Sequence, residues 1–141
     1  MRYERVARLG RGGMGVVDLA RRADGTEVAL KRITLHGSAD EMARARQRIS
    51  REAEVLTKLR HPNVVELLEV LDDGDDVTLV MPYLTGGTLA ERVARHGPAP
   101  VAEVERLADQ LGGALAAAHR AGVVHRDIKP ANVLFDAYGE P

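Results

Sequence analysis

A carboxylate, an ammonium group and a primary amide lie within six residues in the segment HRDIKPAN, residues 125–132 of this 141-residue chain. Asp127 can accept a proton from an attacking hydroxyl and orient it. Lys129 can neutralise charge on a phosphoryl group in transfer, and Asn132 can offer an amide oxygen to a hard cation such as Mg²⁺. We therefore predict phosphate chemistry here, with Asp127 and Lys129 as catalytic residues and Asn132 as catalytic residue and metal ligand.

A glycine-rich segment near the start of the chain is a second candidate for phosphate binding. Gly10, Gly12 and Gly15 fit the pattern GxGxxG, and Val17 follows two residues later. A Rossmann loop needs a helix directly after the last glycine, but residues 16–20 have the composition of a strand. A Walker A loop would continue with Lys and Ser or Thr. A hairpin with a glycine turn remains, in which the backbone can approach phosphates without obstruction by side chains.

Lysine is rare in this chain, because only Lys31, Lys58 and Lys129 are lysines among 20 basic residues. In a strand over residues 28–31, alternation places Ala29 and Lys31 on one face. A small residue beside an ammonium group suits a planar base next to a phosphate chain. The alternative is an ordinary surface lysine.

The elements that must position these residues follow from hydrophobic periodicity and turn signals. Glu52 lies on the first predicted helix, where it is either a partner for Lys31 or a solvated residue. An acidic segment after residue 71 predicts a hairpin turn. The predicted elements are strands within 3–35, a helix over 39–59, strands at 64–71 and 77–81, and helices at 88–96 and 101–121.

Composition limits the classes of function. The net charge of −1 argues against nucleic acid or an anionic membrane as the main partner. The absence of cysteine excludes disulfides and thiolate metal sites. No apolar run approaches the roughly 18 residues needed to span a bilayer, and the N-terminus lacks the pattern of a signal peptide. The resulting expectation is a cytoplasmic protein without a membrane segment.

Taken in order, these motifs resemble the protein kinase superfamily and are most similar to the bacterial eukaryotic-like (Hanks-type) serine/threonine kinases. The resemblance implies an α+β fold with an antiparallel five-stranded N-lobe and one helix (1–81), a hinge (82–86) and the beginning of a helical C-lobe (87–141). The matching segments are GRGGMGVV (10–17), VALK (28–31), REA (51–53), HPN (61–63), MPY (81–83) and HRDIKPAN (125–132).

The resemblance also implies cofactors and partners, namely ATP, Mg²⁺ and protein substrates with Ser or Thr acceptors. Lys31 would contact the α- and β-phosphates and pair with Glu52. Met81 would be the gatekeeper, and the Pro82 carbonyl and the Leu84 N–H would bind the adenine edge. The implied ATP-binding residues are Leu9, Gly10, Gly12, Gly15, Val17, Ala29, Lys31, Glu52, Met81, Pro82, Leu84 and Leu134.

In this family a strand and the motif Asp-Phe-Gly, which carries the principal magnesium ligand, would follow the last residues of the sequence. Whether the chain alone is active is therefore left open, and we expect the isolated chain to be marginally stable or aggregation-prone. Two alternatives remain. One is a catalytically inactive, pseudokinase-like piece that binds nucleotide or a partner. The other is a small-molecule kinase of the aminoglycoside or choline type, which usually has His-Gly-Asp followed by His where this chain has Lys129-Pro130.

Overall fold

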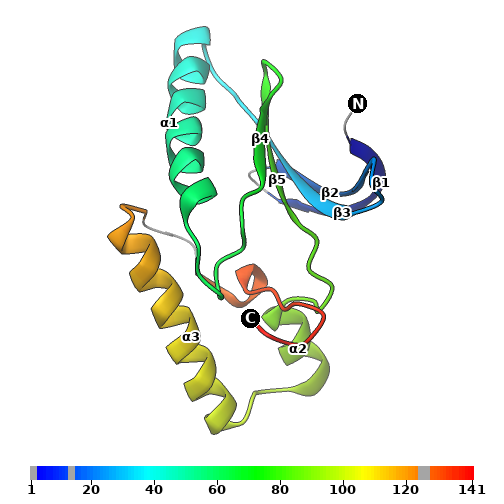
Figure 1. Cartoon of the computed structure of the whole chain (residues 1–141), viewed down its shortest axis with the longest axis vertical. Coiled ribbons are helices and arrows are strands. Elements are labelled where there is room, and N and C mark those ends of the chain that lie inside the picture. Colours follow the sequence, from blue (N-terminus) through cyan, green and yellow to red (C-terminus); the bar gives the residue numbers. More distant parts are fainter. Residues whose placement is uncertain (1–2, 13–14, 124–127) are drawn as a thin grey trace. The chain divides into compact units, whose positions relative to one another are not determined.

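The computed structural model describes residues 3–12, 15–123 and 128–141. The chain divides into two compact units (Figure 1). The first consists of Met1–Lys58 and Val65–Tyr83, and the second of Leu59–Val64 and Leu84–Pro141. The short segment Leu59–Val64 therefore folds with the second unit, although it lies within the predicted range of the first lobe.

The described part of the first unit is built on a five-stranded antiparallel sheet with the strand order β1-β2-β3-β5-β4. This arrangement agrees with the predicted fold class. The Asp-Gly turn between the second and third strands is also present, with Gly25 at φ 88° and the Asp24 carboxylate accepting from the Thr26 N–H at 2.9 Å. This hydrogen bond is the main cause that lowers the pKa of Asp24. The strands are β1 (Tyr3–Gly12), β2 (Gly15–Arg22), β3 (Glu27–Thr34), β4 (Glu69–Asp72) and β5 (Asp76–Pro82).

The predicted strand at 64–71 is wrong over its first half. Only residues from Glu69 onward belong to β4, although the Leu68 N–H already donates to the Val80 carbonyl at 2.8 Å. The cause is a local turn in which the Val64 N–H donates to the His61 carbonyl at 3.1 Å and the Asn63 N–H donates to His61 Nδ1 at 3.1 Å. A backbone closed in this way cannot extend until it has left the turn.

One face of the sheet carries a buried apolar cluster. Ala20, Val28 and Val80 are at most 1% exposed, and Tyr3 at 8% completes the cluster. The Tyr3 hydroxyl donates to a Glu69 carboxylate oxygen on β4. Burial, together with this hydrogen bond, raises the pKa of Tyr3. The Tyr3 side chain therefore links β1 and β4, the two edge strands of the sheet, through this hydrogen bond.

Helix α1 (Ala39–Lys58) lies beside the β4–β5 hairpin (Figure 1). Ser38 caps its start, because the Glu41 N–H donates to Ser38 Oγ, and the Ser38 hydroxyl in turn donates to the Glu41 carboxylate. Arg46 Nε lies 3.2 Å from Asp72 Oδ1 of β4. The apolar residues at helical spacing on α1 are buried or half-buried: Met42, Ala45, Ile49, Ala53 and Leu56.

The second unit contains α2 (Leu89–His96), α3 (Val101–Arg120) and a short 3₁₀ helix η1 (Pro130–Asn132). Thr88 caps α2 and forms a capping box with Glu91. The segment 133–135 runs antiparallel to 86–89, with a bridge between Thr88 and Leu134. The Leu89 N–H donates to Val133 O at 2.8 Å, and the Phe135 N–H donates to Gly87 O at 2.9 Å. The start of α2 is therefore tied to the residues that directly follow η1.

Two contacts explain why Leu59–Val64 belongs to the second unit. The Asn63 side-chain amide donates to the Pro141 carbonyl at 2.7 Å. The His61 ring lies against α3 at Gly113, where an added Cβ would come within 3.4 Å of His61 Nε2. The His-Pro-Asn segment is therefore anchored at both ends.

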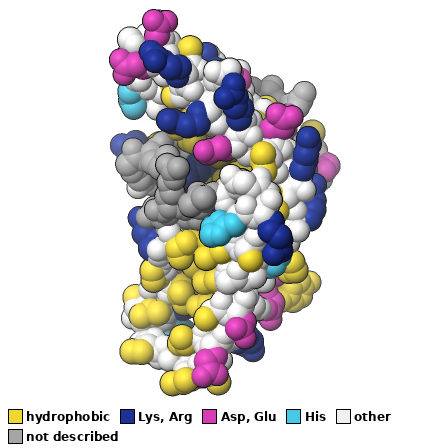
Figure 2. All heavy atoms as spheres, turned by 90° about the vertical axis from the view of Figure 1, so that its left-hand side faces the viewer, with side chains coloured by type: hydrophobic (Ala, Val, Ile, Leu, Met, Phe, Trp, Pro, Cys, Tyr) yellow, Lys and Arg dark blue, Asp and Glu magenta, His cyan; other side chains and the backbone are white. Residues whose placement is uncertain are grey.

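Helix α3 leaves much of its apolar face uncovered. Val101 is 73% exposed and Val104 is 50% exposed, while Ala114 is the residue of α3 that is buried. Figure 2 shows hydrophobic side chains gathered on this part of the surface. Exposed apolar area forfeits about 25 cal/mol per Å². Marginal stability of the isolated chain remains a prediction.

Among the helices of the described ranges, none has both the length and the apolar character needed to cross a membrane.

Gly86 is packed so tightly that no side chain fits. A Cβ there would clash with the Asp136 carbonyl oxygen and lie 2.6 Å from the Phe135 carbonyl oxygen. We expect Gly86→Ala to lower the free energy of unfolding by about 1–3 kcal/mol. Gly112→Ala is the matched control, since Gly112 lies on α3 with open space around it. Removing a helical glycine should stabilise by about 0.5–1 kcal/mol. Urea denaturation followed by circular dichroism measures both, and equal effects would contradict the packing argument.

Candidate functional site

Lys31 occupies the centre of one row across the sheet. Its Cα partners are Val17 on β2 and Leu79 on β5, and side chains of such partners point to the same face. Lys31 is half-buried. Half-burial is typical of a lysine whose aliphatic stem packs beside apolar neighbours. Leu79 was not among the residues predicted from the sequence, although the alternation of residues 77–81 could have placed it once the register was known.

Ala29 occupies the neighbouring row of the same face. Its Cα partners are Leu19 on β2 and Met81 on β5. A methyl group therefore stands between two larger side chains, directly beside the row of Lys31. Val17, Ala29, Lys31 and Met81, all predicted as ATP-binding residues, thus lie together on one face of the sheet.

The glycine-rich segment continues this face, since Gly10 is the Cα partner of Val17 and Gly12 that of Gly15. Gly15 and Gly10 differ in whether the surrounding structure leaves space for a side chain. Gly15 has φ 153°, and a Cβ there would clash with the Arg32 carbonyl oxygen and lie 3.0 Å from its carbon. Around Gly10 a Cβ would meet no described atom within 4 Å. The fold therefore requires glycine at position 15 but not at position 10.

Leu9 and Pro82 lie at the borders of this face. A register shift separates Arg8 from Gly10, so Leu9 has no Cα partner on β2 and is 42% exposed. Pro82 is the last residue of β5 and pairs with Val28, on the opposite face of the sheet. The backbone of Pro82, and not its side chain, is therefore the part that could face a ligand.

Glu52 lies on α1 with an exposed side chain. Among the ion pairs within 4.0 Å between described residues, none joins Glu52 to Lys31. The carboxylate that does pair on this helix is Glu54, with Lys58 at 3.8 Å. The ion pair between Lys31 and Glu52 remains a prediction.

Leu84 and Leu134 belong to the second unit. Leu84 is half-buried, in the coil that follows β5. Leu134 is 38% exposed, whereas its neighbours Val133 and Phe135 are 7% and 4% exposed. Because side chains alternate in an extended segment, Leu134 points away from the interior of this unit.

Lys129 and Asn132 of the predicted catalytic segment lie at the two ends of one tight turn. The Asn132 N–H donates to the Lys129 carbonyl at 2.9 Å, Pro130 begins η1, and both side chains are exposed. Asp127 lies outside the described residues. In the described ranges no three His, Cys, Asp or Glu side chains form a group that could hold a metal. Within the described ranges, Asn132, the predicted magnesium ligand, therefore has no acidic cluster beside it.

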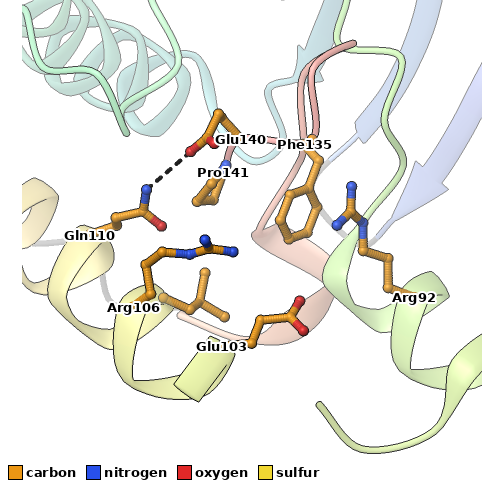
Figure 3. A pocket seen from close by; sticks show the side chains of 9 residues that line it. Arg92, Glu103, Arg106, Gln110, Phe135, Glu140 and Pro141 are labelled. Atoms are coloured by element: carbon orange, nitrogen blue, oxygen red, sulfur yellow. Dashed lines mark hydrogen bonds between the residues drawn. The ribbon is translucent and has the colours of Figure 1, made fainter. Parts of the chain in front are cut away.

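A small hollow of about 40 Å³ lies in the second unit, between α2, α3 and the C-terminal segment (Figure 3). The Arg92 guanidinium stacks 3.6 Å from the centre of the Phe135 ring, and Gln110 donates to Glu140 at 3.2 Å. None of the predicted site residues lines it. The hollow is therefore a local packing feature, separate from the predicted site.

This chain is similar to known proteins in both sequence and fold. The family model described as protein kinase domain matches residues 3–140. This chain belongs to the protein kinase domain family. The solved structure of Rad53 in complex with AMP-PNP matches with a TM-score of 0.84 and 30% identity, over 96% of this chain and 35% of that one. The predicted protein kinase fold is thereby confirmed.

Named relatives of the kinase domain include bacterial and plant proteins. Serine/threonine-protein kinase PkaB of Streptomyces coelicolor is 42% identical over 142 residues, which are 98% of this chain and 32% of that protein. CBL-interacting protein kinase 21 of Oryza sativa subsp. japonica is 40% identical over 139 residues, 98% of this chain and 26% of that protein. The kinase chain described here thus spans about a quarter to a third of the length of these relatives.

The two glycines of the kinase hairpin predict a clear difference in stability. Gly15→Ala should lower the free energy of unfolding by about 2 kcal/mol, because a side chain meets the Arg32 backbone at a strained φ. Gly10→Ala should change it by less than about 0.5 kcal/mol, since the surrounding space is open. Chemical denaturation of both variants beside the parent chain measures this. A Gly10 variant as unstable as the Gly15 variant would show that the open space is filled.

Proposed function

We propose that this chain is the ATP-binding and catalytic-loop part of a serine/threonine protein kinase, which transfers the γ-phosphoryl group of ATP to a Ser or Thr hydroxyl of a protein. The observation that supports this most directly is the register of β2, β3 and β5. It sets Lys31 between Val17 and Leu79, next to the row of Ala29 and beside the open backbone of Gly10.

The proposed nucleotide position follows from the chemistry of that face. Ala29 leaves room for a planar base, with Val17 on one side and Met81 on the other. The Lys31 ammonium would contact the α- and β-phosphates, and the open backbone at Gly10 would approach them. ATP use is supported by the similarity to Rad53, which was solved in complex with AMP-PNP. Leu9, Gly12, Gly15, Glu52, Pro82, Leu84 and Leu134 complete the proposed site.

The proposed chemistry is a transfer to an oriented hydroxyl. Asp127 would accept the hydroxyl proton, and Lys129 would neutralise the charge that develops on the transferring group. Asn132 would be one ligand of Mg²⁺, which when bound neutralises charge on the phosphates. The hydrogen bond from the Asn132 N–H to the Lys129 carbonyl closes a turn that fixes the backbone between Lys129 and Asn132.

The acceptor class and the origin of the chain are further parts of the proposal. The sequence Asp-x-Lys-Pro at 127–130 and relatives named as serine/threonine kinases support Ser or Thr acceptors. A bacterial affinity is supported by PkaB at 42% identity, although the rice relative at 40% is almost as similar. The predicted domain limits at 81, 86 and 87 and a cytoplasmic location also remain proposals.

One observation favours a second candidate function. Lys31 and Glu52 form no ion pair within the described residues, and Glu52 is exposed. A kinase lobe in which these groups stay apart can hold nucleotide without transferring phosphate. The alternative is therefore a nucleotide-binding, pseudokinase-like unit.

Replacement of Lys31 tests the proposal. We expect Lys31→Met to abolish transfer of labelled γ-phosphate to a generic protein acceptor or to the chain itself, with a loss of at least about 100-fold, because a preorganised cation at the phosphates is removed. Lys58→Met is the matched control, since Lys58 is an exposed lysine on α1. It should transfer phosphate at the rate of the parent chain.

The parent chain itself separates the two functions. Binding of AMP-PNP with no transfer that depends on Lys31 would support the pseudokinase-like alternative. Transfer by the parent chain that Lys31→Met leaves unchanged would contradict the assignment of Lys31. Absence of both nucleotide binding and transfer would contradict ATP use by this chain.

A further inference from the structure

Asp18 is a charged residue on the face of the sheet that carries the apolar core. It is 3% exposed, and it shares this face of β2 with the fully buried Ala20. Burying a carboxylate is costly unless cations compensate it. Here Arg5 Nη2 lies 3.0 Å from Asp18 Oδ2, and Arg8 Nε lies 3.3 Å from Asp18 Oδ1. We call these three residues the Asp18 clamp.

The clamp cannot form in a regular strand. Arg5 and Arg8 are three residues apart, and side chains at that spacing point to opposite faces. The pairing register shifts between Arg5 and Ala7, so that Arg5 pairs with Ala20 and Arg8 pairs with Asp18. Val6 is the extra residue of this bulge and is 45% exposed. The bulge is what brings both guanidinium groups to the face of Asp18.

The same bulge keeps the Arg8 side chain away from Val17. If the pairing of Arg5 with Ala20 continued without interruption, Arg8 would lie opposite Val17, on the face of Lys31. In the observed register, after a second shift between Arg8 and Gly10, Gly10 takes that position. The difference is between an arginine side chain and open backbone at the proposed nucleotide site.

We propose that the Asp18 clamp is a positioning device, which holds Arg8 on the core face and thereby keeps its side chain away from Val17, where the open backbone of Gly10 lies in the observed register. This inference rests on the proposed function, since it assumes that nucleotide binds on the face of Lys31. Asp18 does not touch that face and acts through the register of β1. The attraction of one buried carboxylate for two cations favours the shifted pairing between Arg5 and Arg8 over the regular one.

The test combines a register measurement with nucleotide affinity. In Asp18→Asn we expect the cross-strand NMR contacts of Gly10 with Val17 to weaken, and AMP-PNP with Mg²⁺ to bind about fivefold more weakly, as when only about a fifth of the molecules keep the competent register. Glu4→Gln is the matched control, because it removes an exposed carboxylate from the same strand. It should leave both quantities unchanged.

Two milder variants keep the test decisive if Asp18→Asn does not fold. Arg8→Gln should reduce AMP-PNP affinity, and Arg8→Lys, which retains the charge, should restore it to within about twofold of the parent. A merely structural role would lower the stability of Arg8→Gln without changing the affinity of the folded protein, and that outcome would overturn the proposal.

The proposal about the clamp can fail separately from the proposed function. If the parent chain binds no AMP-PNP, the function is wrong and the NMR contacts alone decide whether the clamp sets the register. If the parent binds and Asp18→Asn keeps both its contacts and its affinity, the clamp is wrong and the function stands.

Discussion

The pairing of β2, β3 and β5 constrains everything else in the first unit. Side chains alternate between the two faces with a period of two residues, so a slip by one residue would exchange the faces. Lys31 would then enter the cluster of Ala20, Val28 and Val80, which are nearly inaccessible to water. A lone ammonium group there would lose its hydration without a partner. The apolar cluster therefore determines the register, and the register determines where Lys31 and Ala29 stand.

Charged residues on the two faces of the sheet lie in different environments. On the core face, the buried Asp18 is retained by two guanidinium groups within 3.3 Å. On the other face, Lys31 is half-buried between the apolar neighbours Val17 and Leu79. One sheet thus holds a compensated charge on its core face and a lysine on the opposite face. Both placements follow from the same alternation of side chains.

Much of the fold could be predicted because its signals are local. The alternation in residues 28–31, the Asp-Gly turn at 24–25 and the helical spacing of 42–56 each lie within one element. The hydrogen bonds of the turn at His61 are local, but the segment is also held by contacts of His61 with Gly113 and of Asn63 with Pro141, which are distant in sequence. The bulges of β1 were missed because alternation within one strand does not reveal an extra residue, and Arg5 and Arg8 pair with a carboxylate on the neighbouring strand β2. Of the candidate site, Val17, Ala29, Lys31 and Met81 are brought together, whereas the pairing of Glu52 stays a prediction.

The glycines show why a motif alone cannot establish a binding site. Gly15 and Gly86 are both required by the fold, because backbone atoms of Arg32 and Phe135 occupy the space that a side chain would need. Gly15 belongs to the GxGxxG pattern and Gly86 does not, yet backbone atoms exclude a side chain at both positions. Gly10 differs, because the fold leaves the space around it open. A glycine that its own fold does not need is the stronger evidence for an external ligand. The proposal that the glycine-rich segment binds phosphate therefore depends most on Gly10.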